Sequence, residues 1–425
     1  MARVSVLFML AVVLAVRAKG GVCPLNPVAG LLSGTVPEDV CIPAGFTGLT
    51  IDFFDDYSWR AFGALIAPVN AVSKAGPKVF ETFHPRWEVF HEDGSAPGAA
   101  PRHNACSAQT ITGDLVLASF PGTPDDIGQT ADGFLVGPLV AQNGRYVRYL
   151  TAYNDVAYRH IVENKWYLRA SLPEVPVPRP PVPPVEFPNG SVVVKSAWID
   201  MEGFGTKQQQ RYYTRMATVK DTGSGKCFER LVGLAGLHIV QKTPSRPQWI
   251  WTSFEQVDNA PGNRNEPGGA AGAPGSYALH DGSDMAMPTA NPYGLVPLAV
   301  EPVKPFNVVR SAKAPIHPQT QETNVKYRKL AGSVSPGSVW VNYQLVLTQW
   351  PLQPGDQSAP VPVSHAGDIF QTFPGEGATS AFANLTMETF NQSRPAQGCM
   401  SCHNRARLGA DFMWSVLMHA YPGKK

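Results

Sequence analysis

The sequence predicts an α+β fold: a helical N-terminal part, an antiparallel β-rich body with long loops, and a short C-terminal helical segment. Apolar and aromatic residues recur at helical spacing in the first part and alternate with polar residues after residue 190. A proline-rich stretch separates these two regions. The length of 425 residues is enough for the cores of two or more domains.

The first 18 residues have the features of a signal peptide. Arg3 precedes an apolar run over residues 4–16, and Val16-Arg17-Ala18 offers a small-residue cleavage site. The run is too short for a spanning helix of ~20 residues, and no later run reaches that length. Gly20-Gly21-Val22 before Cys23 makes a poor lipobox. We therefore expect a periplasmic or secreted chain without a lipid anchor.

Residues 19–172 are expected to form a mixed α/β part. A helix is predicted over 56–68, where Ser58 is the candidate N-cap and Pro68 ends the pattern. Trp59, Phe62 and Ile66 fall on one stripe of this helix. Apolar residues at this spacing are typical of a helix face packed in the core rather than of cofactor contacts. A second helical pattern extends over 146–168.

Residues 173–190 are rich in proline and predict a stiff linker or a surface arm. A β-rich body follows over 191–375, and residues 376–425 are expected to pack on it as a C-terminal segment. Alternating patterns predict four strands in the body, at residues 191–199, 212–219, 231–240 and 339–347. Residues 262–293 are rich in Gly, Ala, Pro and Asn, which predicts a long loop.

The most informative stretch is Cys399-Met400-Ser401-Cys402-His403. Cys-x-x-Cys-His is the attachment motif for c-type haem: two thiols reach the two vinyl groups of one porphyrin, and the adjoining imidazole is the proximal iron ligand. A redox dithiol, half of a zinc site or a structural disulfide are the alternatives. A zinc site needs two further ligands at metal-binding spacing, and the chain has no second Cys-x-x-Cys. A thioredoxin-like dithiol follows a strand, whereas this motif follows a polar loop over 391–398. We predict one haem c per chain.

Four cysteines remain if two hold haem. The natural pairing is Cys23 with Cys41 and Cys106 with Cys227, which is one of three connectivities. Disulfides and haem attachment both suit an exported protein.

Lys and Arg number 35 against 33 acidic residues, a net charge of +2. Loss of Arg3 and Arg17 with the signal peptide would balance the charges. No basic block or stripe indicates nucleic acid. The expected partner is a periplasmic redox protein or a small-molecule substrate.

Four phrases occur in the same order as in a known group of proteins: 59–62, 236–259, Gln349-Trp350-Pro351 and 384–389. Over most of its length the chain resembles large, exported bacterial proteins described as cytochrome c family proteins. The resemblance implies a single haem at the C-terminal motif, held by Cys399, Cys402 and His403. It assigns no reaction.

The second axial position of the iron decides the chemistry. Met387 lies on a helix predicted over 380–392, and Met413 and Met418 lie on a helix predicted to start at an Asp411 cap. His419 is a further candidate distal ligand.

His238 is a candidate distal ligand or acid/base, because strand alternation over 236–259 places it beside Val240 and Gly236, with Trp249, Trp251 and Glu255 close in sequence. The alternative is a histidine hydrogen-bonded inside a β core.

Three function classes follow from the haem. Two protein ligands on the iron predict electron transfer, and an open position predicts a peroxidase- or oxygenase-like oxidoreductase. A small-ligand binding or sensing module is the third class.

Overall fold

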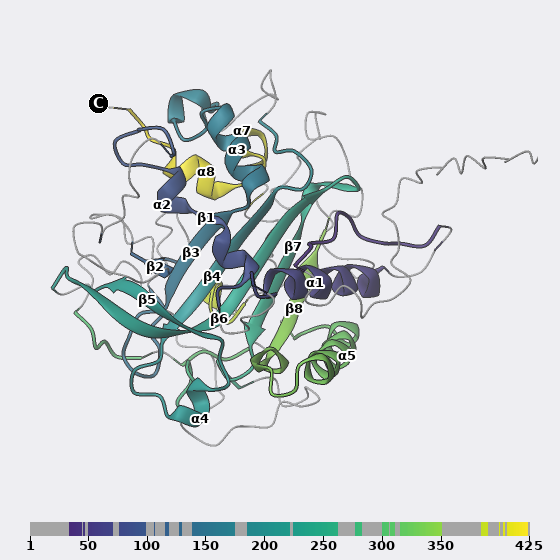
Figure 1. Ribbon diagram of the computed structural model, residues 1–425, viewed down its shortest axis with the longest axis vertical. Coiled ribbons are helices and arrows are strands. Elements are labelled where there is room, and N and C mark those ends of the chain that lie inside the picture. Colours follow the sequence, from purple (N-terminus) through teal and green to yellow (C-terminus); the bar gives the residue numbers. More distant parts are fainter. Residues whose placement is uncertain are drawn as a thin grey trace, which may run out of the picture.

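A computed structural model describes the chain over residues 34–44, 46, 50–70, 76–98, 106, 115–118, 127–129, 138–174, 185–221, 224–261, 277–282, 300–305, 307–310, 315–350, 384–389, 399, 403 and 406–423. Within these residues the fold is α+β, built around one sheet with helices on its faces and at one end (Figure 1). The predicted fold class is confirmed in this mixed α+β form.

The sheet has eight strands in the described part of the chain. They are β1 (His84–Pro85), β2 (Leu115–Leu117), β3 (Arg148–Tyr153), β4 (Val192–Asp200), β5 (Thr214–Lys220), β6 (Cys227–Thr243), β7 (Arg246–Gln256) and β8 (Tyr343–Gln349). The order β1-β3-β4-β6-β5-β2 forms a curled half-barrel, and β7 joins β6 to β8. Every pair is antiparallel except β2 with β5.

The long strand β6 explains the curl of the sheet. One edge of β6 pairs with β4 along most of its length. Its other edge is divided: residues up to Gly233 pair with β5, and residues from Gly236 onward pair with β7. Because two strands leave the same edge in different directions, the sheet cannot stay flat. Regular sheets already twist by roughly 20–25° per strand, and this branch adds to that twist.

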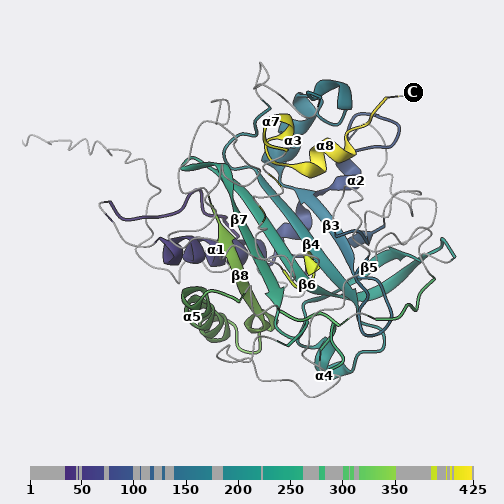
Figure 2. The ribbon, with the colours of Figure 1, turned by 180° about the vertical axis from the view of Figure 1, so that it is seen from behind.

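The helices with bounds inside the described part of the chain are α1 (Ile51–Leu65), α2 (Arg86–Val89), α3 (Asp155–Glu163), α4 (Thr206–Gln209), α5 (Pro318–Val334), α7 (Arg407–Ala410) and α8 (Trp414–His419). Short 3-10 helices there are η2 (Val79–Thr82), η3 (Arg169–Ser171) and η4 (Val339–Asn342). The helices α3, α7 and α8 gather at one end of the sheet, and α1 and α5 lie beside β7 and β8 (Figures 1 and 2). No helix that the structure describes combines the length and apolarity needed to cross a lipid bilayer.

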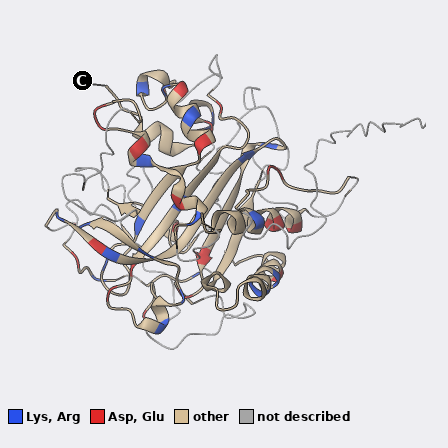
Figure 3. Ribbon diagram, in the orientation of Figure 1, with Lys and Arg blue, Asp and Glu red and all other residues tan. Residues whose placement is uncertain are grey.

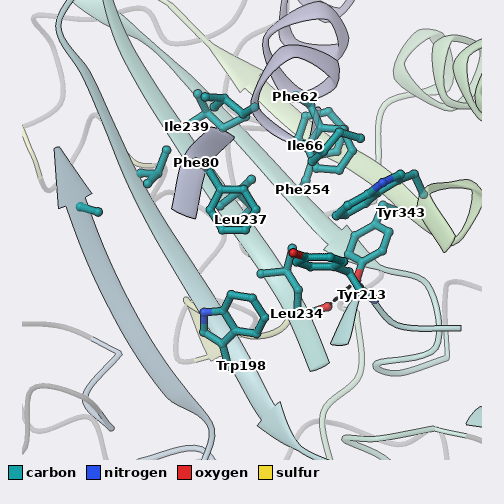
Figure 4. Close-up of a cluster of buried hydrophobic side chains, with 14 of the residues drawn as sticks. Phe62, Ile66, Phe80, Trp198, Tyr213, Leu234, Leu237, Ile239, Phe254 and Tyr343 are labelled. Atoms are coloured by element: carbon teal, nitrogen blue, oxygen red, sulfur yellow. Dashed lines mark hydrogen bonds between the residues drawn. The ribbon is translucent and has the colours of Figure 1, made fainter. Parts of the chain in front are cut away.

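The largest core cluster lies between α1, α5 and one face of the sheet (Figure 4). The predicted stripe of α1 is confirmed, because Trp59, Phe62 and Ile66 are all buried in this cluster. Phe62 stacks on Phe254 of β7 with ring centroids 4.1 Å apart. Burial of each large side chain contributes roughly 1.5–3 kcal/mol, so this cluster holds α1 against the sheet.

Four predicted strands are confirmed as β4, β5, β6 and β8, with shifted ends. The helix predicted over 146–168 is wrong in its first part, where residues 148–153 form β3 and α3 begins at Asp155. Tyr149 and Tyr153 pair opposite Ala197 and Val193 of β4. The aromatic residues of this stretch favour a strand, and pairing along a whole neighbouring strand outweighs a short helical pattern.

Two strands from opposite sides of the proline-rich segment 173–190 are direct neighbours. β3 precedes this segment and β4 follows it, and they pair along six residue pairs from Arg148–Trp198 to Tyr153–Val193. The N-terminal part and the β-rich body therefore share one sheet.

Cys106 forms a disulfide with Cys227, as expected from the natural pairing. Cys41 is also disulfide-bonded, to a partner outside the described residues. Such bonds are typical of proteins outside the cytoplasm. Lys, Arg, Asp and Glu are interspersed over the described helices and strands, without a single-sign stripe (Figure 3).

Candidate functional site

The face of the sheet opposite α1 carries the predicted site residue His238. Its register places Lys195 of β4 and Ser253 of β7 on either side of it. The next same-face positions along β6 are Gly236 and Val240, as the alternation predicted, and they pair with Glu255 and Trp251 of β7. Part of the C-terminal segment packs on this row of residues.

Residues 384–389 form a turn that packs on this face of the sheet, so the helix predicted over 380–392 is wrong in its described part. The side chain of Asn384 explains the turn. Its amide donates to Ser253 Oγ at 3.0 Å and to the Phe254 carbonyl at 2.9 Å, and its Oδ1 accepts from the Thr386 backbone N–H at 2.8 Å. Asn side chains compete with helix formation by such local bonds. Tyr149 adds a hydrogen bond from its hydroxyl to the Thr386 carbonyl at 2.6 Å.

The close approach of this turn requires Gly236. A Cβ atom at this position would lie 2.4 Å from Thr386 Oγ1 and 3.1 Å from Met387 Cε. The glycine therefore lets Met387 reach the sheet beside His238. Met387 is fully buried.

His238 faces an acidic partner from the same turn. Its Nε2 lies 3.3 Å from Oε1 of Glu388. Burial opposes ionisation of Glu388, but His238 and Lys195 outweigh that effect, so the pKa of Glu388 is lowered. Burial lowers the pKa of Lys195 to about 8. The ammonium group of Lys195 donates to the Gln129 carbonyl and lies 5.1 Å from the centre of the Tyr149 ring.

The second C-terminal piece is held to the sheet by Asp411. Its buried carboxylate accepts hydrogen bonds from Lys242 Nζ at 2.9 Å and from the Phe187 backbone N–H at 2.7 Å. Asp411 does not cap the following helix as predicted, because it ends α7 with φ of 48°, and α8 begins at Trp414. Phe412 also has a positive φ of 71°. L residues rarely adopt this conformation, so the contacts of Asp411 must hold the turn in place.

This turn directs the Phe412 carbonyl at His403. The Nδ1 atom of His403 donates to that oxygen at 2.7 Å, while the ring lies 4.4 Å from the Trp251 ring between centroids. Burial lowers the pKa of His403 to about 4, and the Phe412 bond offsets this in part. The imidazole is therefore neutral near pH 7. With Nδ1 carrying the proton, Nε2 presents its lone pair.

Cys399 and His403 both have helical backbone conformation, four residues apart. Cys399 is half-buried against a second core cluster, to which the sheet contributes Val240 and Trp251 and the C-terminal segment contributes Phe412. Cys402, the other predicted haem-binding cysteine, lies outside the described residues.

The residues around His403 fit a c-type haem. A histidine that binds a metal through one ring nitrogen almost always donates the other N–H to a carbonyl or carboxylate, which fixes the tautomer. His403 makes such a bond to Phe412, and the neutral form set by burial is the form that binds iron. The apolar cluster beside Cys399 suits the porphyrin edge.

The other candidate distal ligands differ in their surroundings. Met413 is buried in the same cluster as Phe412, next to the His403 segment. Met418 is 41% exposed, so its side chain lies at the surface. His419 accepts a hydrogen bond from Arg86 Nη1 at 2.9 Å, and burial lowers its pKa well below the usual range. Met387 and Met413 are thus buried, Met418 lies at the surface, and His419 is bonded to Arg86.

Lys195, Glu388 and the Phe412 carbonyl are site residues that sequence reasoning missed. The sheet alternation alone could have placed Lys195 on one face of β4. The partners of His238 and His403 depend on which segments meet in space, and neither carries a local signal.

Several predicted features lie wholly or largely outside the described residues: the signal peptide 1–18, Cys23, most of 173–190 and most of 262–293. No protein-family model, no curated protein and no solved structure matches this chain.

Proposed function

We propose that this protein binds one haem c covalently through Cys399 and Cys402, with His403 as proximal ligand, and transfers electrons outside the cytoplasm. The observation that carries the proposal is the 2.7 Å hydrogen bond from His403 Nδ1 to the Phe412 carbonyl. It occurs at the histidine of the Cys-x-x-Cys-His motif and orients that side chain as a metal-binding imidazole is oriented.

The haem would supply an iron that gains one electron and passes it on to a redox partner. The protein's part is to hold His403 in one tautomer, to surround the site with apolar side chains, and to supply a second ligand. The cluster containing Trp251, Phe412 and Met413 supports the apolar surroundings. Met387 is the favoured second ligand, because it is fully buried and held on the same sheet face as His238.

Export is supported by two independent features. The sequence of residues 1–18 is typical of a signal peptide, and Cys106 is bonded to Cys227. Both fit an oxidising compartment, where haem c is attached and disulfides persist. The proposed partner is therefore a periplasmic redox protein.

A haem-dependent oxidoreductase with an open iron position is the second candidate. It is favoured by the pair of His238 and Glu388, 3.3 Å apart, with Lys195 beside it. Paired acidic and basic side chains on the His403 side of the sheet could exchange protons with a substrate. Such a role requires that no protein side chain occupies the second axial position.

The test is a full-length chain exported together with haem-attachment machinery. We expect a coloured protein whose mass is that of the processed polypeptide plus one haem, and a pyridine haemochrome spectrum of the c type. His403→Ala should abolish the native spectrum while the porphyrin stays attached. His419→Ala is the matched control, because that ring is bonded to Arg86, and it should keep the spectrum.

A colourless product with the mass of the polypeptide alone would contradict the proposal. The ferric spectrum separates the two candidates. A low-spin spectrum with a methionine-to-iron charge-transfer band supports electron transfer. A high-spin spectrum that shifts with cyanide, together with peroxide-dependent dye oxidation that Glu388→Gln removes, supports the oxidoreductase.

A further inference from the structure

A cavity of about 320 Å³ lies on the face of the sheet opposite His238. Its floor is formed by Leu150 and Ala152 of β3 and by Val194, Ser196 and Trp198 of β4. Val194 and Ser196 pair with Ile239 and Leu237, which face the α1 side of the sheet. The cavity is thus separated from the His403 site by the sheet itself.

The curl of the sheet creates this cavity. β2 pairs with β5 at one end of the strand order, yet the curl brings β2 back into contact with β3. Leu115 and Val116 of β2 form one wall. The segment carrying η2, β1 and α2 crosses the face of β3 and β4 and forms the opposite wall (Figure 1). Mouths of curled or closed sheets are common ligand sites, and ligand pockets measure roughly 300–1,000 Å³.

Aromatic rings form part of the cavity lining. Phe80, Phe83 and Trp87 line it from the crossing segment, and Trp198 lines it from the sheet. Phe80 and Trp198 lie 6.3 Å apart between ring centroids at an interplanar angle of 26° (Figure 4). Ring faces in the lining favour an aromatic ligand, since ring pairs add about 0.5–1.5 kcal/mol beyond area burial.

The polar part of the lining is confined to the crossing segment and Ser196. It includes the carboxylates of Glu81 and Glu88, the imidazole of His84 and the hydroxyl of Thr82. Thr82 is exposed and His84 is partly exposed, so the polar groups reach the rim. A carboxylate has about four lone-pair positions on two oxygens and can accept several hydrogen bonds. A ligand hydroxyl at this edge could donate a hydrogen bond to one of these carboxylates.

The ionisable groups of the lining already have ionic partners. Glu88 Oε2 lies 3.5 Å from Nδ1 of His84, whose Nε2 lies 2.9 Å from Asp155 Oδ1. Hydrogen bonding to Glu88 is the main cause that raises the pKa of His84. Glu81 Oε1 lies 3.4 Å from Nε of Arg215. A charged ligand would have to compete with these pairs, so the lining selects a neutral molecule.

We propose that this cavity is a binding site for a small, neutral aromatic molecule that carries a hydroxyl group. The ring would lie among Phe80, Trp87 and Trp198, with the hydroxyl at the Glu88 and His84 edge. The site is independent of the proposed haem function, because none of its lining residues belongs to the His403 side of the sheet.

The experiment titrates 4-methylphenol into the exported full-length protein labelled with ¹⁵N at the indole nitrogens. We expect saturable shifts of the Trp87 and Trp198 indole signals, each assigned by a Trp→Phe variant. Toluene, which lacks the hydroxyl, and the charged analogues benzoate and benzylamine should each bind at least about tenfold more weakly. No shift with 4-methylphenol, or tighter binding of a charged analogue, would overturn the proposal.

Ala152→Phe fills the cavity from its floor and should weaken 4-methylphenol binding at least about tenfold. Val325→Phe adds the same ring at an exposed position of α5 and should leave binding unchanged. Undiminished binding by a folded Ala152→Phe protein would place the ligand elsewhere. If that variant does not fold, the unaltered protein is tested by nuclear Overhauser contacts from 4-methylphenol to the methyl groups of Leu115 and Val194. These contacts support the site, and their absence contradicts it.

Discussion

The ammonium group of Lys242 lies 2.9 Å from the carboxylate of Asp411, and both side chains are almost completely buried. Lys242 is near the end of β6, and Asp411 sits in the turn whose next residue, Phe412, receives the hydrogen bond of His403. This ion pair therefore ties the geometry of the candidate haem ligand to the central sheet.

Replacing Lys242 by Met should destabilise the protein strongly. The change leaves the Asp411 carboxylate buried without its cation, which typically costs ~3–5 kcal/mol. Urea denaturation followed by circular dichroism measures the free energy of unfolding. Lys326→Met removes an exposed lysine that lies 3.4 Å from Asp56, and it should change stability by less than ~0.5 kcal/mol. Equal effects of the two variants would show that the buried pair does not hold the turn.

Gly236→Ala should destabilise the protein and disturb the site on the sheet. The new methyl group would meet Thr386 Oγ1 at 2.4 Å, and overpacking of this kind costs ~1–3 kcal/mol. The matched control is Gly332→Ala in α5, where the nearest side-chain atom, Val341 Cγ1, is 3.5 Å away. That change should stabilise the helix by ~0.5–1 kcal/mol. Thermal unfolding of both variants checks the opposite signs.

Met387→Leu should convert the ferric haem from low spin to high spin if Met387 is the second ligand. Leucine keeps the volume of the side chain, so the fold should lose less than ~1.5 kcal/mol. Met413→Leu is the matched control in the neighbouring cluster and should leave the spin state unchanged. The absorption spectrum gives the readout. The reverse pattern would assign the ligand to Met413. No change in either variant would exclude both methionines and leave His238 as the next candidate ligand to test.

Asp55 should make stability depend on pH. Burial raises the pKa of this carboxyl to about 7 from an ordinary value of 3.8, although hydrogen bonds from Thr320 and Thr348 lower it in part. The folded state then holds the proton more tightly than the unfolded chain does. The free energy of unfolding should fall by a few kcal/mol as pH rises from about 4 to about 7, and this contribution should be constant above that range.

Asp55→Asn should remove this slope, measured by urea denaturation at several pH values. Glu322→Gln makes the same chemical change at an exposed position of α5 and should keep the slope of the unaltered protein. A slope that persists in Asp55→Asn would assign the pH dependence to other groups.

Local patterns in the chain predicted much of the architecture. Alternation located β4, β5, β6 and β8, and helical spacing located the buried stripe of α1. The same patterns failed at residues 146–168 and 380–392. In the first stretch, pairing of β3 with β4 outweighed a short helical periodicity. In the second, Asn384 bonds to the sheet and to its own turn.

The sequence by itself determined which reactive groups the C-terminal segment carries, because two thiols and an imidazole occur there at fixed spacing. Strand alternation in the sequence also predicted that His238 lies on the same sheet face as Gly236 and Val240. The tertiary structure alone decided which groups meet them. The Phe412 carbonyl reaches His403 only through a left-handed turn held by Lys242, and Glu388 reaches His238 only because Gly236 lets the turn approach. The physical reason is that local spacing fixes the direction of a side chain, whereas its partner depends on register and packing between residues far apart in the chain.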